Sequence, residues 1–294
     1  MKLPAFSYVA PTSLGEAVEA LAAGAPDAQP LAGGQSLLPA MALGMVRPTM
    51  LVDLGLVPGL DALEAAGHGT VVIGAMARQR AVERHPELLR RCPAIGEAAG
   101  HVGSVPVRNR GTVGGSIANA DPGAEWPCLL LALDGEVDAT GPEGSRTIRG
   151  VDLYPAPFAA ALAPGELLTE VRLRLPAGPA GAAFRELALR SGASAIVGVA
   201  AVLGTDPVGT VHHARVAVLN GGSTPMRADA AERVMLGRAP TDDAVDEAIA
   251  AVRDEVDPPG DRSFSAGYRR HLAGTLAGRA LRAARDRIGG RAAW

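Results

Sequence analysis

Two glycine-rich segments carry the residue types best suited to holding a ligand. The first is L-A-G-G-Q-S-L-L, from Leu31 to Leu38, and the second is G-T-V-G-G-S-I-A-N-A-D-P, from Gly111 to Pro122. Backbone that lies directly against a ligand favours glycine, because a side chain would hold the ligand off. Consecutive N–H groups in such a turn also form a cradle for anions. Two such segments in one chain predict a ligand with two phosphates, held from both sides.

The segments exclude two common phosphate-binding sites and leave the ligand open at this point. A nicotinamide cofactor, a flavin dinucleotide and a nucleotide all carry a suitable diphosphate. A Rossmann site requires G-x-G-x-x-G and an acidic residue about twenty positions later, which neither segment has. A P-loop requires Gly-Lys followed by Ser or Thr. The chain contains no Gly-Lys pair, and its single lysine is Lys2.

Composition removes several other classes of function. A net charge of −3 and 3% aromatic residues argue against a nucleic-acid partner. The two cysteines, Cys92 and Cys128, form no C-x-x-C pair, so this chain alone builds neither an iron–sulfur cluster nor a structural zinc site. The apolar run 195–204 is about half the length that crosses a bilayer, and the N-terminus lacks a signal-peptide core. We therefore predict a cytoplasmic protein with no membrane span and no metal of its own.

The first segment is predicted to lie between a strand and a helix. A capping box at Ser13 and Glu16 starts a helix that ends before Gly24. A strand at 29–32 leads into the segment, Ser36 caps a helical turn that reaches Leu43, and the next strand covers 50–54. This order places the N–H groups of the segment at a helix N-terminus, where negative charge is favoured.

The second segment belongs to a larger predicted unit. Asp121 is predicted as an N-cap with Pro122 at the first helical position, ahead of an apolar helix over 127–133. The other elements predicted in this unit are a strand at 70–75, a helix at 93–101, a hairpin of 136–140 with 146–148, and a strand through 171–175 whose arginines face solvent.

A Pro/Gly-rich linker at 176–181 separates a C-terminal unit. Its predicted strands cover 184–189, 195–203 and 214–220, followed by a helix capped by Thr241 and a last helix over 266–288. The fold class is α+β. We predict one domain over 1–175, with parts at about 1–58 and 59–175, and a second over 182–294.

Both segments, their order and their spacing resemble the medium subunit of the molybdenum hydroxylases, the xanthine dehydrogenase and carbon monoxide dehydrogenase family. That family's first segment reads A-G-G-[HNQ]-[ST]-L-[LI]-P, and this chain has A-G-G-Q-S-L-L-P from Ala32. Its second reads [RN]-x-x-G-T-[IV]-G-G-[NS], here R-N-R-G-T-V-G-G-S from Arg108, followed by Asp121-Pro122 and Glu125. The resemblance extends to the opening F-S-Y-x-x-P and the final Y-R-x-x-L helix.

The resemblance implies a two-part FAD-binding fold of the vanillyl-alcohol-oxidase and p-cresol-methylhydroxylase (PCMH) type, followed by a small antiparallel sheet with helices. It implies non-covalent FAD with both segments closing on the diphosphate. Glu125 matches an acidic position that hydrogen-bonds FAD hydroxyls, and Leu168 is a flavin-contacting or core residue. The implied cofactor-binding residues are Leu31, Ala32, Gly33, Gly34, Gln35, Ser36, Leu37, Leu38, Thr112, Val113, Gly114, Gly115, Ser116, Glu125 and Leu168.

The chain departs from the family at three places. Ser116 stands where asparagine is frequent, and Gln35 stands where histidine is frequent, so a histidyl attachment of flavin there is impossible. After the linker, members often carry lysine and an aromatic or acidic residue, whereas this chain has Glu186 and S-G-A-S-A from Ser191. The resemblance therefore assigns no flavin-ring contact in the C-terminal unit.

The implied function is an electron-transferring oxidoreductase subunit. Molybdopterin lies on a large partner subunit and two [2Fe-2S] clusters lie on a small one, in a heterohexamer with two copies of each chain. We find no catalytic acid, base or nucleophile, which fits a chain whose flavin carries the chemistry. The alternatives are a stand-alone FAD-dependent oxidoreductase of the same fold and a structural subunit that has lost its flavin.

Overall fold

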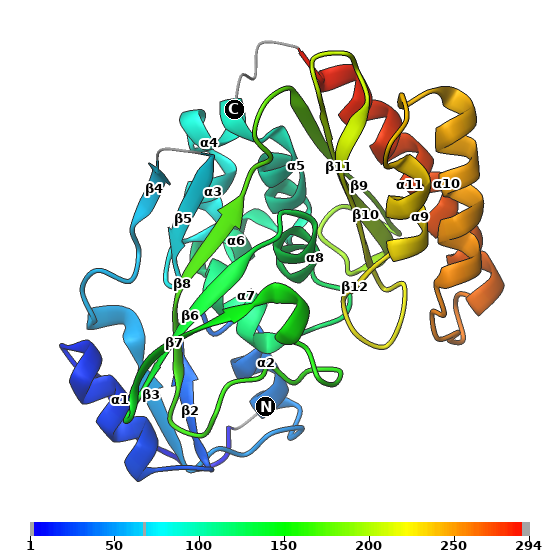
Figure 1. Ribbon diagram of the computed structural model, residues 1–294. Coiled ribbons are helices and arrows are strands. Elements are labelled where there is room, and N and C mark those ends of the chain that lie inside the picture. The colour runs from blue at the N-terminus through cyan, green and yellow to red at the C-terminus, as the bar shows by residue number, and fades with distance from the viewer. Residues whose placement is uncertain (1–2, 67–68, 290–294) are drawn as a thin grey trace.

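The computed structural model describes residues 3–66 and 69–289, and its N-terminal part is a small parallel sheet (Figure 1). The strand order is β1 (Ser7–Val9), β3 (Met50–Asp53), β2 (Ala28–Leu31). Helix α1 (Leu14–Ala23) begins where predicted, because the Ser13 hydroxyl accepts the Glu16 N–H at 3.2 Å. The Glu16 carboxylate reaches back to the Thr12 N–H at 2.8 Å. Reciprocal bonds of this kind satisfy donors that a helix start leaves free.

A five-stranded antiparallel sheet follows. Its order is β4 (Leu63–Ala66), β5 (Thr70–Gly74), β8 (Leu167–Arg174), β6 (Glu136–Gly141), β7 (Gly144–Arg149). The predicted hairpin is confirmed as β6 and β7. The predicted solvent-facing side of β8 is also confirmed, since its Arg172 pairs with the carboxylates of Glu136 at 2.9 Å and Glu170 at 2.6 Å.

Short helices connect the strands of these two sheets. They are α2 (Leu37–Ala42), η1 (Leu54–Leu56), α3 (Gln79–Glu83), α4 (Pro86–Arg91), α5 (Pro93–His101), α6 (Val105–Arg110), α7 (Val113–Asn119), α8 (Glu125–Ala132) and η2 (Gly150–Asp152). The bounds of α5 match the prediction. The cap predicted at Asp121 is wrong: α8 begins at Glu125, and Asp121 Oδ1 instead accepts the Gly123 N–H at 2.9 Å within a turn.

The C-terminal part is a four-stranded antiparallel sheet between two layers of helices (Figure 1). Its order is β12 (Met226–Arg227), β11 (Val211–Leu219), β10 (Ala195–Thr205), β9 (Ala180–Ala188). Helices α9 (Asp229–Met235), α10 (Asp242–Glu255) and α11 (Ala266–Arg287) cover one face, and α5 and α8 cover the other. Every residue of β10 is buried, as expected of a strand covered on both faces. The α+β class is thereby confirmed.

Polar contacts fix this sheet against α5 and the end of α8. Glu97 of α5 accepts the Phe184 N–H at 2.8 Å and binds Arg185 and Arg287 at 2.9 and 2.6 Å. Asp134, just after α8, binds Arg215 of β11 at 2.7 Å. We call this boundary between the C-terminal sheet and helices α5 and α8 the seam. None of the helices in the described part of the chain is long and apolar enough to cross a membrane.

Candidate functional site

The two glycine segments, far apart in sequence, lie against each other. A Cβ atom on Gly33 would lie 2.4 Å from the Arg110 carbonyl oxygen and 2.7 Å from the Gly111 Cα. A Cβ on Gly115 would lie 3.5 Å from that of Ala32. Glycine at position 33 therefore allows the two backbones to touch. The structure brings both predicted segments into one site.

The first segment presents free donors. Among the described residues, the N–H groups from Gly33 to Ser36 have no acceptor. Gly34 has φ +71°, a left-handed conformation that glycine adopts without strain. Successive free N–H groups around a left-handed residue form an anion-binding nest. Helix α2 follows as predicted, but the Ser36 hydroxyl caps none of the described N–H groups, so the predicted cap bond is wrong.

The second segment works differently from the prediction. It is the first turn of α7 with Thr112 as N-cap, and the protein already uses three of its N–H groups. Their acceptors are the Ala77 oxygen at 3.0 Å for Val113, the Ala75 oxygen at 2.9 Å for Gly114, and the Thr112 hydroxyl at 3.1 Å for Gly115. These three described N–H groups are therefore not available to form a second anion-binding cradle. The hydroxyls of Thr112 and Ser116 donate to no acceptor among the described residues.

Glycine at position 114 serves the packing of α7. A Cβ there would lie 2.5 Å from the Ala75 Cβ and 2.8 Å from the Ala75 oxygen. The start of α7 therefore lies directly on the chain that leaves β5. In this segment the glycine is needed for close approach within the protein.

Sequence analysis missed two site residues in the segment after β5, Arg78 and Gln79. Arg78 donates to the Arg110 carbonyl, the same oxygen that Gly33 approaches. Burial and the neighbouring Arg110 charge lower the pKa of Arg78. Because Arg110 directly precedes Gly111, two arginines lie beside the segments. Gln79 donates its N–H to the Gly111 oxygen at 3.0 Å and its amide to the Thr112 oxygen at 3.3 Å. The one available signal was their position, a few residues after the V-x-I-G-A strand.

Glu125 occupies the first turn of α8 and is 8% exposed. Burial is the main cause that raises its pKa to about 7; the Asp121 charge acts in the same direction, and a backbone hydrogen bond and the Arg108 charge oppose it. A carboxyl group with this pKa changes charge near neutral pH, which ordinary glutamates do not. Leu168, the other residue predicted outside the segments, is 5% exposed in the core on β8, a strand that packs against α7.

A second buried carboxyl group, Glu186 on β9, lies on the seam and was not predicted as a site residue. Its side chain is 1% exposed, and neither carboxyl oxygen has a hydrogen-bond partner among the described residues. One of these oxygens, Oε1, lies 3.7 Å from His101 Nδ1. Burial, followed by the Glu125 charge, raises the pKa of Glu186 to about 8.

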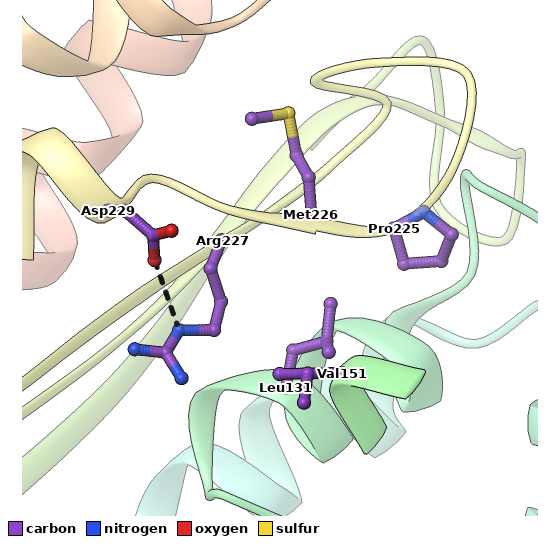
Figure 2. Close-up of a pocket in the computed structure, with 6 residues that line it drawn as sticks. All are labelled: Leu131, Val151, Pro225, Met226, Arg227 and Asp229. Atoms are coloured by element: carbon purple, nitrogen blue, oxygen red, sulfur yellow. Dashed lines mark ion pairs between the residues drawn. The ribbon is translucent and has the colours of Figure 1, made fainter. Parts of the chain in front are cut away.

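A separate hollow of about 460 Å³ lies where β12 meets α8 and η2 (Figure 2). It is lined by Leu131, Val151, Pro225, Met226, Arg227 and Asp229. Its arginine is already paired with Asp229 at 3.7 Å and with Glu232. None of these lining residues belongs to the glycine segments, so the hollow is not part of the candidate site.

Neither metal nor thiol chemistry is indicated. Within residues 3–66 and 69–289, no group of three or more His, Cys, Asp or Glu side chains could hold a metal ion. Cys92 and Cys128 are buried, and burial raises the pKa of each thiol to about 12. Neutral, buried thiols are poor nucleophiles. What remains is a binding site for an anionic ligand.

The fold and this site define a flavin-binding protein, as comparison with known proteins shows. Residues 4–176 match the family described as FAD binding domain in molybdopterin dehydrogenase, and residues 182–284 match the CO dehydrogenase flavoprotein C-terminal domain. The chain belongs to the family of FAD-carrying medium subunits of the molybdenum hydroxylases.

Relatives match over almost the whole chain. The 6-hydroxypseudooxynicotine dehydrogenase complex subunit alpha of Paenarthrobacter nicotinovorans is 39% identical over 96% of this chain and 95% of its own. The carbon monoxide dehydrogenase medium chain of Hydrogenophaga pseudoflava is 36% identical over 96% and 97%. A solved structure of carbon monoxide dehydrogenase from H. pseudoflava superposes with a TM-score of 0.94 at 38% identity, covering 98% of this chain and all of the other. The predicted family and fold are confirmed.

Proposed function

We propose that this chain holds FAD at the two glycine segments and works as the electron-transferring subunit of a three-subunit molybdenum hydroxylase. When bound, FAD supplies two-electron and one-electron redox chemistry. The proposed electron source is the pair of [2Fe-2S] clusters on a small partner, fed by molybdopterin on a large partner, and an external acceptor receives the electrons. The chain's own task is to bind and orient the cofactor.

The observation that carries the proposal is the contact of the two segments at Gly33, with a free N–H nest on one side. The nest from Gly33 to Ser36 suits one phosphate, and the hydroxyls of Thr112 and Ser116 suit the other. Arg78 and Arg110 lie beside this contact, and their charges would balance those of a diphosphate. Residues of these types and charges fit FAD.

The remaining predicted site residues complete this proposal. Eight further residues of the two segments would frame the cofactor with their backbone and side chains: Leu31, Ala32, Gln35, Leu37, Leu38, Val113, Gly114 and Gly115. The Glu125 carboxylate would accept hydrogen bonds from FAD hydroxyls, since a carboxylate has acceptor capacity for two or more. Leu168 would support this site from the core side.

The assembly and the division of the chain belong to the same proposal. We expect a complex with two copies each of the large, medium and small subunits, located in the cytoplasm. We also divide the chain into an FAD-binding domain over 1–175 and a C-terminal domain over 182–294. Residues 1–2, 67–68 and 290–294 of these ranges lie outside the described residues.

The test is a visible spectrum of the purified chain, followed by co-purification. The proposal expects yellow flavin absorbance that dithionite bleaches, about one FAD released per chain on denaturation, and two partner chains that co-purify. A chain saturated with FAD and then desalted that shows no flavin absorbance would contradict the cofactor assignment. Substrate oxidation by the lone, flavin-loaded chain would favour a stand-alone enzyme instead.

A further inference from the structure

Glu186 has a chemical feature that the proposed function leaves unused. It combines a side chain that is 1% exposed with two carboxyl oxygens that have no hydrogen-bond partner in the described part of the chain. Burying a polar group without a partner costs free energy, on the order of 1–3 kcal/mol for a neutral group and more for a charged one. A buried carboxyl group that is kept unpartnered is therefore a candidate for contact with a ligand.

The strand pattern explains why Glu186 lies inside the protein. Successive side chains of a strand alternate between its faces, so Glu186 shares a face of β9 with Ala182 and Phe184. Those two residues are in the core formed with α5 and α8. Glu186 continues this face toward the end of the strand. Opposite it on β10 is Gly198, which contributes no side chain that could pair with the carboxyl group.

The face of β9 that carries Glu186 packs in the core shared with α5 and α8, and α8 begins at Glu125, a residue of the proposed FAD site. Glu125, in the first turn of α8, is near enough for its charge to raise the pKa of Glu186. Helix α8 follows α7, whose first turn is the second glycine segment. Further along the chain, the loop after β9 contacts the residues just before α6, because a Cβ on Gly192 would lie 3.0 Å from the Gly103 oxygen.

We propose that Glu186 is an FAD-binding residue that keeps its carboxyl proton and donates it in a hydrogen bond to an acceptor atom of the cofactor. This inference rests on the proposed function, because it assumes that FAD occupies the site beside Glu125. A neutral carboxyl group offers one O–H donor, whereas a carboxylate offers acceptors only. The flavin ring and ribityl chain carry carbonyl and hydroxyl oxygens that accept such a bond.

The surrounding groups keep the proton on Glu186. From α8, the Glu125 charge raises its pKa, and the neutral Cys128 thiol adds no charge. From α5, His101 is mainly neutral near pH 7 because burial lowers its pKa. Glu97 of α5 is committed to Arg185 and Arg287. Glu125 therefore ionises first, at about pH 7, and burial together with the Glu125 charge delays ionisation of Glu186 until about pH 8.

Two opposite pH effects on FAD affinity follow. Binding strengthens as Glu125 ionises, because a carboxylate is the better acceptor for FAD hydroxyls. Binding weakens as Glu186 ionises, because the donor proton is lost. The dissociation constant should therefore pass through a minimum between the two transitions. Above about pH 8 it should rise by about tenfold in total and then level off, which is the loss expected when one hydrogen-bond donor is removed.

The experiment measures FAD binding to the full chain after its flavin has been removed. FAD fluorescence quenching is titrated from about pH 5.5 to about pH 9.5, a range that brackets both carboxyl groups. Glu186→Gln keeps a donor but cannot ionise, so its FAD binding should no longer weaken above about pH 8 (the alkaline limb) and should still strengthen as Glu125 ionises near pH 7 (the acid limb). At pH 7 it should bind FAD within about threefold of wild type. Glu186→Leu lacks the donor and should bind about tenfold more weakly at pH 7.

Two further variants separate this effect from general pH sensitivity. Glu125→Gln removes the charge that raises the pKa of Glu186, so the alkaline limb should move to lower pH. Glu247→Gln makes the same chemical change on the outer helix α10, where Glu247 pairs with Arg238 at 2.8 Å, and should leave both limbs unchanged. An infrared carboxylic-acid band that shifts on FAD binding, and that Glu186→Gln lacks, gives a readout independent of affinity.

The outcomes distinguish the inference from the function on which it rests. If wild type binds FAD but Glu186→Gln keeps the alkaline limb, or Glu186→Leu binds as tightly as wild type at pH 7, the role of Glu186 is refuted and the FAD assignment stands. If wild type binds no FAD at any pH, the proposed function is refuted and this inference with it.

Discussion

Replacement of Gly33 by alanine tests whether the contact between the two glycine segments matters. Gly33 does not have a positive φ, so alanine is conformationally acceptable there and the effect is purely steric. The added Cβ would lie 2.4 Å from the Arg110 oxygen and 2.7 Å from the Gly111 Cα. Ordinary contacts begin at about 3.4 Å, so one backbone must move by about 1 Å. Overpacking of this kind costs about 1–3 kcal/mol.

Thermal unfolding and FAD retention measure the result. We expect the flavin-free Gly33→Ala chain to melt about 3–10 °C lower, since 1 kcal/mol shifts Tm by about 2–4 °C at this domain size. We also expect its FAD to be lost on desalting, because the separated segments no longer hold one diphosphate together. Gly15→Ala is the matched control: its Cβ meets nothing within 4 Å, and alanine favours a helix by about 0.5–1 kcal/mol. A Gly33→Ala chain as stable and as yellow as Gly15→Ala would refute the argument.

Three further predictions concern ionisable groups that are buried or half-buried. The pKa of Glu186 is raised in the folded chain, so its protonated form adds stability that is complete below about pH 4.5 and lost as pH rises to about 8. The free energy of unfolding of Glu186→Gln should therefore rise by about 1–4 kcal/mol relative to that of flavin-free wild type as the pH increases from about 5.5 to about 8.5, as measured by urea unfolding. A difference between the two proteins that does not change with pH would contradict this. Glu97→Gln should lose about 2–3 kcal/mol, because two arginines lose their carboxylate partner. Calorimetry checks that loss, and a Tm equal to wild type would count against it. Cys92 and Cys128 should react with Ellman's reagent only after denaturation, since both thiols are buried with raised pKa values; rapid reaction of the native chain would show the burial to be wrong.

Elements with local signals were predictable from the sequence. The Ser13 cap, the Thr241 cap of α10 and the proline at the start of α5 each act within one helical turn, and the structure has all three. That both glycine segments belong to one site was predicted from their composition. In these cases the residues that determine the structure are neighbours in the chain or carry a family motif.

Features that depend on distant residues were not predictable in this way. The N–H groups of Val113 and Gly114 looked available for a ligand, but carbonyls of the chain after β5 accept them. Asp121-Pro122 has the composition of a helix start, yet α8 begins three residues after Pro122 because the aspartate closes a turn instead. Glu186 resembles any strand glutamate in sequence. Only the packing of β9 on α5 and α8 shows that it is buried.

The contacts that Glu97 and Arg287 make with β9 have a consequence for assembly. β9 is the outer strand of its sheet, and an exposed outer strand can pair with a strand from another chain. Here the Phe184 N–H donates to Glu97, and the Ala182 carbonyl accepts from Arg287 at 2.6 Å. Side chains thus occupy backbone groups that a foreign strand would need. We therefore expect partner subunits to dock on side-chain surfaces of this chain and not to extend its sheet at β9.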